Sequence, residues 1–261
     1  MAAPRALVLR APGANCDLES AFAFERAGAV AERVHVNRLL ERPRLLDDFQ
    51  VLCLPGGFSY GDDLGAGRIL GSQIQHHLFD ALAEFKAAGK LVLGICNGFQ
   101  ILVKSGILLD DAADPRGPAA TLTNNDSGKF EDRWVRLQAN GERCVFFAGC
   151  DSLYLPVAHA EGKFVPRDPA TLAVLESAGQ LVLRYAANGN GVGGPVAYPD
   201  NPNGSVAAVA GVCDTTGRVC GLMPHPERHI DPTQHPRWTR GPLPPEGDGL
   251  AIFRNAVRYL R

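Results

Sequence analysis

The sequence has 261 residues, of which 46% are hydrophobic and 21% charged, values typical of a globular protein long enough to bury a large core. Its 26 basic and 28 acidic residues give a net charge of −2, and the absence of a dense basic tract argues against nucleic-acid binding. No apolar run approaches the ~18 residues of a membrane span, and the opening MAAPRALVLRAPG has too short an apolar run for a signal peptide. The seven cysteines form no close pairs, so we expect a reducing, cytoplasmic environment rather than a disulfide framework.

The first hundred residues alternate between strand-like and helix-like segments. Apolar runs predict strands at 5–10, 31–36, 50–55 and 91–95, and helical periodicity predicts helices at 17–28, at 68–89 and from Asn97 to about Gly106. This β-α-β order predicts a doubly wound, mixed but mostly parallel sheet flanked by helices. In such a sheet the ligand crevice lies at the carboxyl ends of the strands.

After about residue 118 the pattern changes to short strands with turn residues between them. Strands are predicted at 121–126, 133–139, 144–149, 153–159 and 181–187, a hairpin at 207–224 around the turn 214–217, and an amphipathic closing helix at 249–260. The proline-rich stretch 232–245 is interpreted as a loop, because a single helix follows it. With no internal repeat and no low-complexity linker, we expect one domain over residues 1–261.

Cys96 is the first candidate for chemistry, because it lies between the predicted strand 91–95 and the helix that begins at Asn97. A strand-to-helix turn exposes its side chain at the edge of a sheet and directs helix N-terminal amides toward it, which suits a thiolate nucleophile. Gly94 and Gly98 on either side permit a sharp turn and close approach of a substrate. The alternative is a core cysteine, since cysteine is often fully buried, and a partner residue is needed to decide.

His225 is the candidate partner, and it lies between Pro224 and Pro226 in GLMPHPERHI. Pro226 favours an extended conformation at His225, and residues two apart in an extended segment face the same side, so we expect Glu227 to orient the imidazole. A thiol, an imidazole and a carboxylate together form the cysteine version of a catalytic triad.

Two other interpretations of this segment exist. His225, Glu227, His229 and His235 are potential metal ligands, but their spacing matches no zinc pattern and no His-Glu-x-x-His is present. A proline-rich surface turn is the other possibility. The other cysteines lack the close spacing of zinc or redox pairs.

Backbone amides near the predicted nucleophile can stabilise an oxyanion. The turn Pro55-Gly56-Gly57 follows a strand at the same predicted edge, so the amides of Gly57 and Asn97 are candidates for an oxyanion hole. The alternative for the two glycines is a tight turn alone. The segment GNGVGG at 189–194 resembles a dinucleotide loop only superficially, because no helix follows it, and there is no P-loop.

These motifs resemble those of the class I, or triad, glutamine amidotransferases. The resemblance runs from residue 5 to residue 260 and is carried by five segments in the family's order: LPGGFSYGDDL, GICNGFQIL, NNDSGKFEDRW, NPNGS and GLMPHPER. It implies a flavodoxin-like amidotransferase domain with Cys96 as nucleophile and with His225 and Glu227 as its partners. It also implies that the Gly57 and Asn97 amides stabilise the oxyanion and that Gln100 helps to hold the substrate L-glutamine.

The resemblance also implies the partners of this chain. No cofactor or metal is expected on the chain itself. Ammonia from glutamine would pass to a separate synthetase subunit that holds ATP and Mg²⁺, and a requirement for a third, small subunit is left open. Rival interpretations are an amidotransferase serving another acceptor, a cysteine hydrolase with the same turn, and a non-catalytic scaffold. The intact Cys96, His225 and Glu227 argue against the scaffold.

Three segments depart from the family pattern. Ala160 stands where a glycine is expected, which questions a left-handed backbone there. Asp63 and Gly65 replace an aromatic residue and an arginine in a stretch expected to contact the partner. The loop DPTQHPRWTRGPLPPEG at 231–247 is longer than the family pattern predicts.

Overall fold

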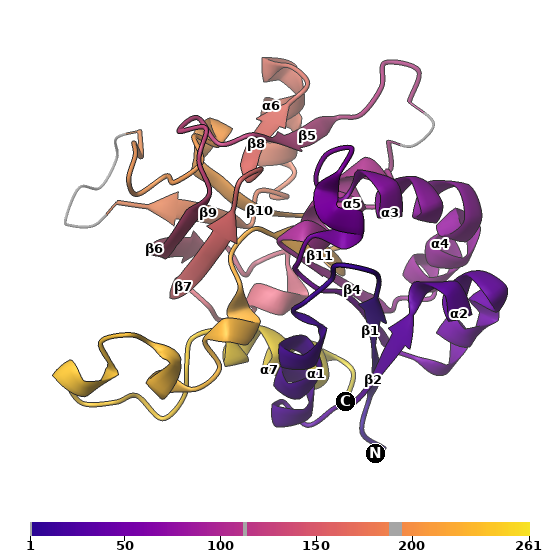
Figure 1. The fold of residues 1–261 in the computed structure, drawn as a ribbon, viewed down its shortest axis with the longest axis horizontal. Coiled ribbons are helices and arrows are strands. Elements are labelled where there is room, and N and C mark those ends of the chain that lie inside the picture. Colours follow the sequence, from indigo (N-terminus) through magenta and orange to yellow (C-terminus); the bar gives the residue numbers. More distant parts are fainter. Residues whose placement is uncertain (1, 112–113, 188–194) are drawn as a thin grey trace.

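One nine-stranded sheet runs through the protein, in the strand order β2-β1-β3-β4-β11-β10-β9-β6-β7 (Figure 1). The structure is a computed structural model that describes residues 2–111, 114–187 and 195–261. The strands are β1 (Arg5–Arg10), β2 (Val30–His35), β3 (Val51–Leu54), β4 (Leu91–Ile95), β5 (Ala120–Thr123), β6 (Glu131–Ala139), β7 (Ser152–His159), β8 (Lys163–Pro166), β9 (Leu183–Ala186), β10 (Val209–Cys213) and β11 (Val219–Leu222). Strands β5 and β8 form a separate antiparallel pair.

The sheet has a parallel half and an antiparallel half. Strands β2, β1, β3, β4 and β11 pair in parallel, and β11, β10, β9, β6 and β7 pair antiparallel. The predicted fold class is therefore confirmed. Strands β3, β4 and β11 are buried throughout, as their apolar runs predict for strands covered on both faces.

Seven α-helices lie in the described part of the chain. They are α1 (Asp17–Arg26), α2 (Val36–Glu41), α3 (Arg68–Gln73), α4 (Phe79–Ala87), α5 (Asn97–Lys104), α6 (Pro169–Ser177) and α7 (Leu250–Tyr259). Helix α1 packs on α7 through an edge-to-face contact of Phe24 and Phe253, whose ring centroids are 4.9 Å apart. Helix α3 packs closely on α5, where a Cβ on Gly71 would lie 3.1 Å from Lys104 Cβ. None of the helices within the described residues is long and apolar enough to cross a membrane.

The structure corrects several of the predicted elements. The predicted strand at 144–149 is wrong: Val145–Phe147 form a short 3-10 turn that buries Phe146 and Phe147. The predicted helix 68–89 divides into α3, a π-helical segment at Ile74–Leu78 and α4. Helices α2 and α6 and strand β8 were not predicted from the sequence. The segment 189–194 lies outside the described residues.

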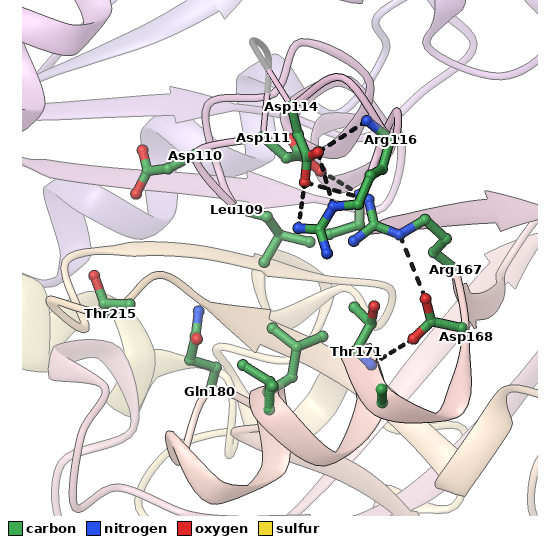
Figure 2. A pocket seen from close by; sticks show the side chains of 14 residues that line it. Leu109, Asp110, Asp111, Asp114, Arg116, Arg167, Asp168, Thr171, Gln180 and Thr215 are labelled. Carbon is green, nitrogen blue, oxygen red and sulfur yellow. Dashed lines mark hydrogen bonds and ion pairs between the residues drawn. The ribbon is translucent and has the colours of Figure 1, made fainter.

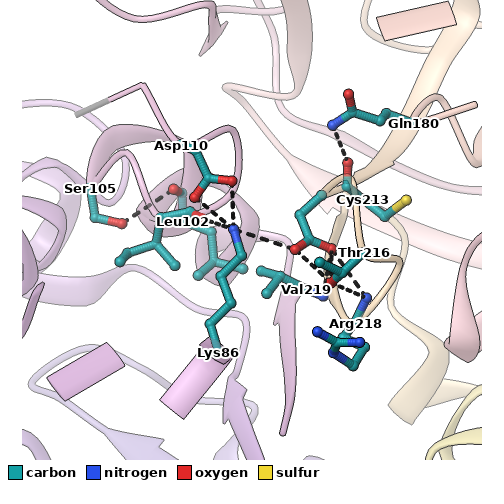
Figure 3. Close-up of polar contacts among 11 residues, drawn as sticks. Lys86, Leu102, Ser105, Asp110, Gln180, Cys213, Thr216, Arg218 and Val219 are labelled. Atoms are coloured by element: carbon teal, nitrogen blue, oxygen red, sulfur yellow. Dashed lines mark hydrogen bonds and ion pairs between the residues drawn. The ribbon is translucent and has the colours of Figure 1, made fainter. Parts of the chain in front are cut away.

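A partly buried lysine ties α4 to the turn before β11 (Figure 3). Lys86 of α4 binds Asp110, at 2.7 Å, and Asp214 in the β10–β11 turn, at 3.3 Å. Asp214 is fully buried and also accepts hydrogen bonds from the backbone amides of Arg218 and Val219. These contacts fix the beginning of the strand that leads to His225.

Candidate active site

Cys96 lies at the turn between β4 and α5, as the sequence predicts, and is 5% exposed. Its backbone is left-handed, with φ of 50° and ψ of −104°, a costly conformation for a residue with a side chain and one found at nucleophile turns. A Cβ on Gly98 would lie 1.9 Å from Leu54 O, and one on Gly94 would lie 2.7 Å from Gly98 O. The two glycines are therefore required for α5 to begin directly against the sheet.

Strand β11 brings His225 to the same edge of the sheet, because it runs parallel to β4. The two strand ends are joined where Cys96 N donates to Leu222 O at 2.7 Å. His225 Nδ1 and Glu227 Oε1 are 2.7 Å apart, and both side chains are buried.

The local backbone at Glu227 differs from the prediction. An extended segment was expected to place Glu227 beside the ring, but Glu227 lies in a short 3-10 turn, Pro226–Arg228. Proline at the first position favours such a turn because its φ is already helical. The turn brings the carboxylate back to the imidazole, so the predicted contact forms by a different route.

The charge around His225 favours its protonated form. Burial alone would lower the pKa of this imidazole, but the Glu227 carboxylate and then Cys96 raise it well above its usual value. His225 Nε2 makes no hydrogen bond to a described residue. Cys96 Sγ is close to Ala158 O, at 3.7 Å. The site therefore holds a thiol beside an imidazole that can carry a proton at neutral pH.

A cavity of about 190 Å³ opens beside Cys96. Its lining residues come from both halves of the sheet and from the loop after β3: Gly57, Phe58, Asp62, Ala66, Cys96, Gln100, Ala158, His159, Ala160 and Glu161. The cavity lies at the carboxyl ends of the parallel strands, where the sequence places the ligand crevice.

The two predicted oxyanion amides lie at this edge. Gly57 lines the cavity with φ of 137°, and a Cβ there would lie 2.6 Å from Asn15 N and 2.8 Å from Ala14 Cα. Only glycine fits this position without moving the neighbouring backbone. Asn97 is the first residue of α5, so its amide belongs to the helix N-terminus. The structure is compatible with the oxyanion role, which stays a prediction.

Gln100 lines the cavity, but its side-chain amide is held by the protein. Its Nε2 donates to Glu161 O at 2.6 Å, and its Oε1 accepts from Asn97 Nδ2 at 3.0 Å. Gln100 therefore positions the cavity wall at Glu161, and its predicted contact with the substrate stays a prediction.

A larger cavity, of about 300 Å³, lies elsewhere, between residues 109–111 and 114–119 on one side and α6 on the other (Figure 2). Three of its charged groups are paired with one another: Asp114 binds Arg116 at 2.7 Å and Arg167 at 3.4 Å. It contains no thiol or imidazole. We therefore place the chemistry in the smaller cavity, where the nucleophile lies.

Sequence reasoning missed Cys16, which lies behind His225. Cys16 Sγ is 4.0 Å from His225 Nδ1 and accepts a hydrogen bond from Arg228 Nη2 at 3.1 Å. Cys16, His225 and Glu227 offer ligand atoms within 4.8 Å of one another, and of these groups Cys16 Sγ accepts from Arg228 while His225 Nδ1 lies 2.7 Å from Glu227 Oε1. No spacing rule predicts a contact between residues so far apart in the sequence.

His229 and His235 are the other two residues that the sequence offered as potential metal ligands, and they lie in a different environment from His225 and Glu227. His235 packs edge-to-face on Trp134, at 4.5 Å between ring centroids, and His229 does so at 4.8 Å. His229 Nδ1 is 2.9 Å from Tyr154 O. These contacts pin the start of the long 231–247 loop to β6 and β7.

Ala160, Asp63 and Gly65 are the other departures from the family pattern, and all three are compatible with the site. Ala160 is not among the residues with positive φ, so alanine is accommodated there without strain. Gly65 has φ of 110°, and nothing lies within 4 Å of a Cβ placed on it. Asp63 is exposed and does not line the cavity.

Known glutamine amidotransferases are similar to this chain over its whole length. The CobB/CobQ-like glutamine amidotransferase domain matches residues 3–260. A phosphoribosylformylglycinamidine synthase subunit PurQ from Dehalococcoides mccartyi is 48% identical over 100% of this chain and 99% of its own length. One from Methanococcus maripaludis is 40% identical over 98% of this chain and 97% of its own. A chain in the structure of PurLQS from Thermotoga maritima has 31% identity, a TM-score of 0.74 and complete coverage of both chains.

Proposed function

Because the chain belongs to the CobB/CobQ-like glutamine amidotransferase family, we propose that it is the glutaminase subunit of phosphoribosylformylglycinamidine synthase. It hydrolyses L-glutamine and supplies ammonia to a synthetase subunit. That partner converts formylglycinamide ribonucleotide and ATP to formylglycinamidine ribonucleotide in de novo purine biosynthesis. The observation that carries this proposal is the 48% identity over the full length of a PurQ subunit.

The arrangement of Cys96 and His225 supports a thioester mechanism. The Cys96 thiolate attacks the carboxamide carbon of glutamine, and the amides of Gly57 and Asn97 stabilise the resulting oxyanion. His225 then gives its proton to the leaving nitrogen, because an amide anion is too basic to depart unaided. Ammonia leaves, a γ-glutamyl thioester remains on Cys96, and water hydrolyses it to glutamate.

The ammonia is consumed on another chain. The sequence holds no phosphate-binding loop, so we assign ATP and Mg²⁺ to the synthetase partner and no cofactor to this chain. The three-part name of the Thermotoga maritima structure, PurLQS, supports a synthetase partner and makes a third small subunit a candidate member of the complex. The seven free cysteines favour a reducing cytoplasm as the site of action.

Cys96→Ser tests the proposal directly. In the complex with its synthetase subunit, this variant should lose glutamine-dependent synthesis but keep ammonia-dependent synthesis, because the nucleophile is separate from the ATP site. Measuring formylglycinamidine ribonucleotide with each nitrogen source distinguishes the two activities. Glutamine-driven turnover near the wild-type rate would refute the assignment of Cys96.

Coupling to the partner gives a second test. Hydrolysis without an acceptor wastes glutamine, so we expect the isolated chain to be a weak glutaminase that the complete complex activates. The turn Pro55-Gly56-Gly57 is the candidate switch, because a peptide flip at glycine creates or removes an oxyanion donor worth roughly 100-fold in rate. Glutamate release is compared for the chain alone, with the partner, and with partner, ATP and acceptor. Equal rates in all three would favour a free-standing hydrolase.

A further inference from the structure

Arg228 follows Glu227 directly in the sequence, yet within the described residues its guanidinium forms no ion pair with that carboxylate. Its Nη2 donates instead to Cys16 Sγ, at 3.1 Å. We propose that Cys16 is a positioning residue of the active site, which holds the Arg228 side chain away from Glu227. The carboxylate then stays paired with His225 alone. The inference rests on the proposed function, because it concerns the imidazole that serves glutamine hydrolysis.

Glu227 has an oxygen that is open to a competitor. Its Oε1 lies 2.7 Å from His225 Nδ1, whereas its Oε2 is buried and has no hydrogen-bond partner among the described residues. Buried polar atoms are almost always partnered, so such an oxygen readily accepts a new donor. A guanidinium is a strong one, because it binds both oxygens of a carboxylate in a charge-assisted pair. Arg228 is therefore the nearest rival of His225 for this carboxylate.

The charge of Glu227 already acts on Arg228. Burial alone would lower the pKa of this guanidinium, but Cys16 and then Glu227 raise it. Arg228 is half-buried, so losing its hydrogen bond to the sulfur without a replacement costs free energy. Glu19 of α1 is the other carboxylate whose charge acts on Arg228, but Glu227 is the one that is fully buried beside it. A released Arg228 would turn to Glu227.

Cys16 is a fixed acceptor, because its backbone is held from two sides. Its carbonyl oxygen accepts from Ser20 Oγ at 2.7 Å and from Ser20 N at 3.0 Å, and its amide donates to Gly56 O at 3.2 Å. The thiol donates to Asn15 Oδ1 at 3.3 Å, which leaves the lone pairs of the sulfur for Arg228. With the residue only 1% exposed, water does not take the place of this contact.

Several titratable groups face the imidazole of His225 or its carboxylate partner: Glu227, Cys96, Cys16, His159 of β7 and Cys53 of β3. Burial raises the pKa of Cys53 and lowers the pKa of His159 to about 3, so both are uncharged at neutral pH. Glu227 is the carboxylate among these groups, and its charge raises the pKa of His225 against the effect of burial. Its contact with the ring is the one that a released Arg228 would weaken.

The experiment follows the alkaline limb of kcat/KM for glutamate release by the complex with the synthetase subunit. Cys16→Ala and Cys16→Val both remove the sulfur acceptor, and valine keeps the side-chain volume and so preserves packing. We expect both to move the limb down by about one pH unit, with little change in KM, since a cation on the carboxylate weakens its effect on the imidazole. Cys16→Ser keeps an acceptor for Arg228 and should stay within about 0.3 pH units of wild type.

Arg228→Gln separates this role from a direct effect of the sulfur on the ring. Without the guanidinium there is no competitor, so Cys16→Ala/Arg228→Gln should recover most of the displacement seen in Cys16→Ala. A limb unmoved in both Cys16→Ala and Cys16→Val, or a double variant displaced as far as Cys16→Ala, would overturn the inference. Either result would leave the glutaminase assignment intact.

Cys144→Ala is the matched control, because Cys144 is also 1% exposed but lies beside the β10–β11 turn. It should lower Tm and leave the alkaline limb in place, and an equal displacement there would overturn the inference. Ammonia-dependent synthesis by each variant reports that the complex has assembled. If the wild-type complex released no glutamate, the proposed function would fail and the inference with it.

Discussion

Replacing Glu227 by glutamine tests whether the carboxylate acts through its charge. The substitution removes the charge that faces His225 but keeps an oxygen able to accept a hydrogen bond from Nδ1. In the wild-type protein Glu227 holds the pKa of His225 above its usual value against the effect of burial. Without the carboxylate, burial remains and the pKa falls. The proton that His225 must give to the leaving nitrogen is then lost at a lower pH, so the alkaline limb of the kcat/KM profile moves down.

The contact between Glu227 and His225 sets the expected size of this pKa shift. The two groups are 2.7 Å apart and the side chains are 3% and 0% exposed, so solvent screens them little. A hydrogen bond between charged groups contributes about 1.5–3 kcal/mol, and one pKa unit corresponds to about 1.4 kcal/mol. We therefore expect the alkaline limb to move down by about one to two pH units.

The assay is glutamate release by the complex at low glutamine concentration through the neutral and alkaline range. Glu227→Asp is the control, since it keeps the charge and should displace the limb less than Glu227→Gln does. A limb unmoved by Glu227→Gln, or displaced equally by both variants, would refute the electrostatic argument.

Three further outcomes follow from the site. His225→Ala should abolish glutamine-dependent synthesis, whereas Glu227→Ala should leave measurable residual activity, because an orienting group contributes less than the base it orients. Equal and mild losses of activity in the two variants would instead favour a plain surface turn at this segment. Gly57→Ala should lower kcat by roughly 100-fold or more, because it displaces the oxyanion amide. Gly65→Ala is the control for backbone strain, since Gly65 also has a positive φ but lies in open space. Cys16→Ala should lower kcat several-fold with little change in KM, because it loosens the wall behind the imidazole; a change confined to KM in steady-state kinetics would contradict this.

The parallel half of the fold is predictable because local signals agree there. The runs at 5–10 and 91–95 coincide with β1 and β4, and the helix predicted from Asn97 is α5. The error at 144–149 has a physical cause. An apolar run with two phenylalanines is compatible with a strand or with a buried turn, and packing of that turn against α7 decides the outcome. The π-helical segment inside 68–89 also lacks a local signature.

The triad residues could be predicted from the sequence because each lies in a segment with unusual local constraints. Cys96 ends an apolar strand between two glycines, and His225 lies between two prolines. Cys16 and Asp62 had no such signal. Their place in the site depends on β3 lying between β1 and β4, and on a loop that folds over the cavity, which are properties of the assembled sheet.

The pairing of β4 with β11 has a consequence for how the protein is made. These two strands are neighbours at the centre of the sheet, yet about half of the chain separates them in sequence. During synthesis the edge of β4 has no partner until the β10–β11 hairpin has emerged, and such long-range pairing is slow and exposes an unpaired edge. Leu222 O, which anchors the Cys96 turn, belongs to that late hairpin. A nascent chain therefore carries its thiol through about half of the synthesis of this sequence without the histidine that activates it, and acquires activity only after His225 has been added.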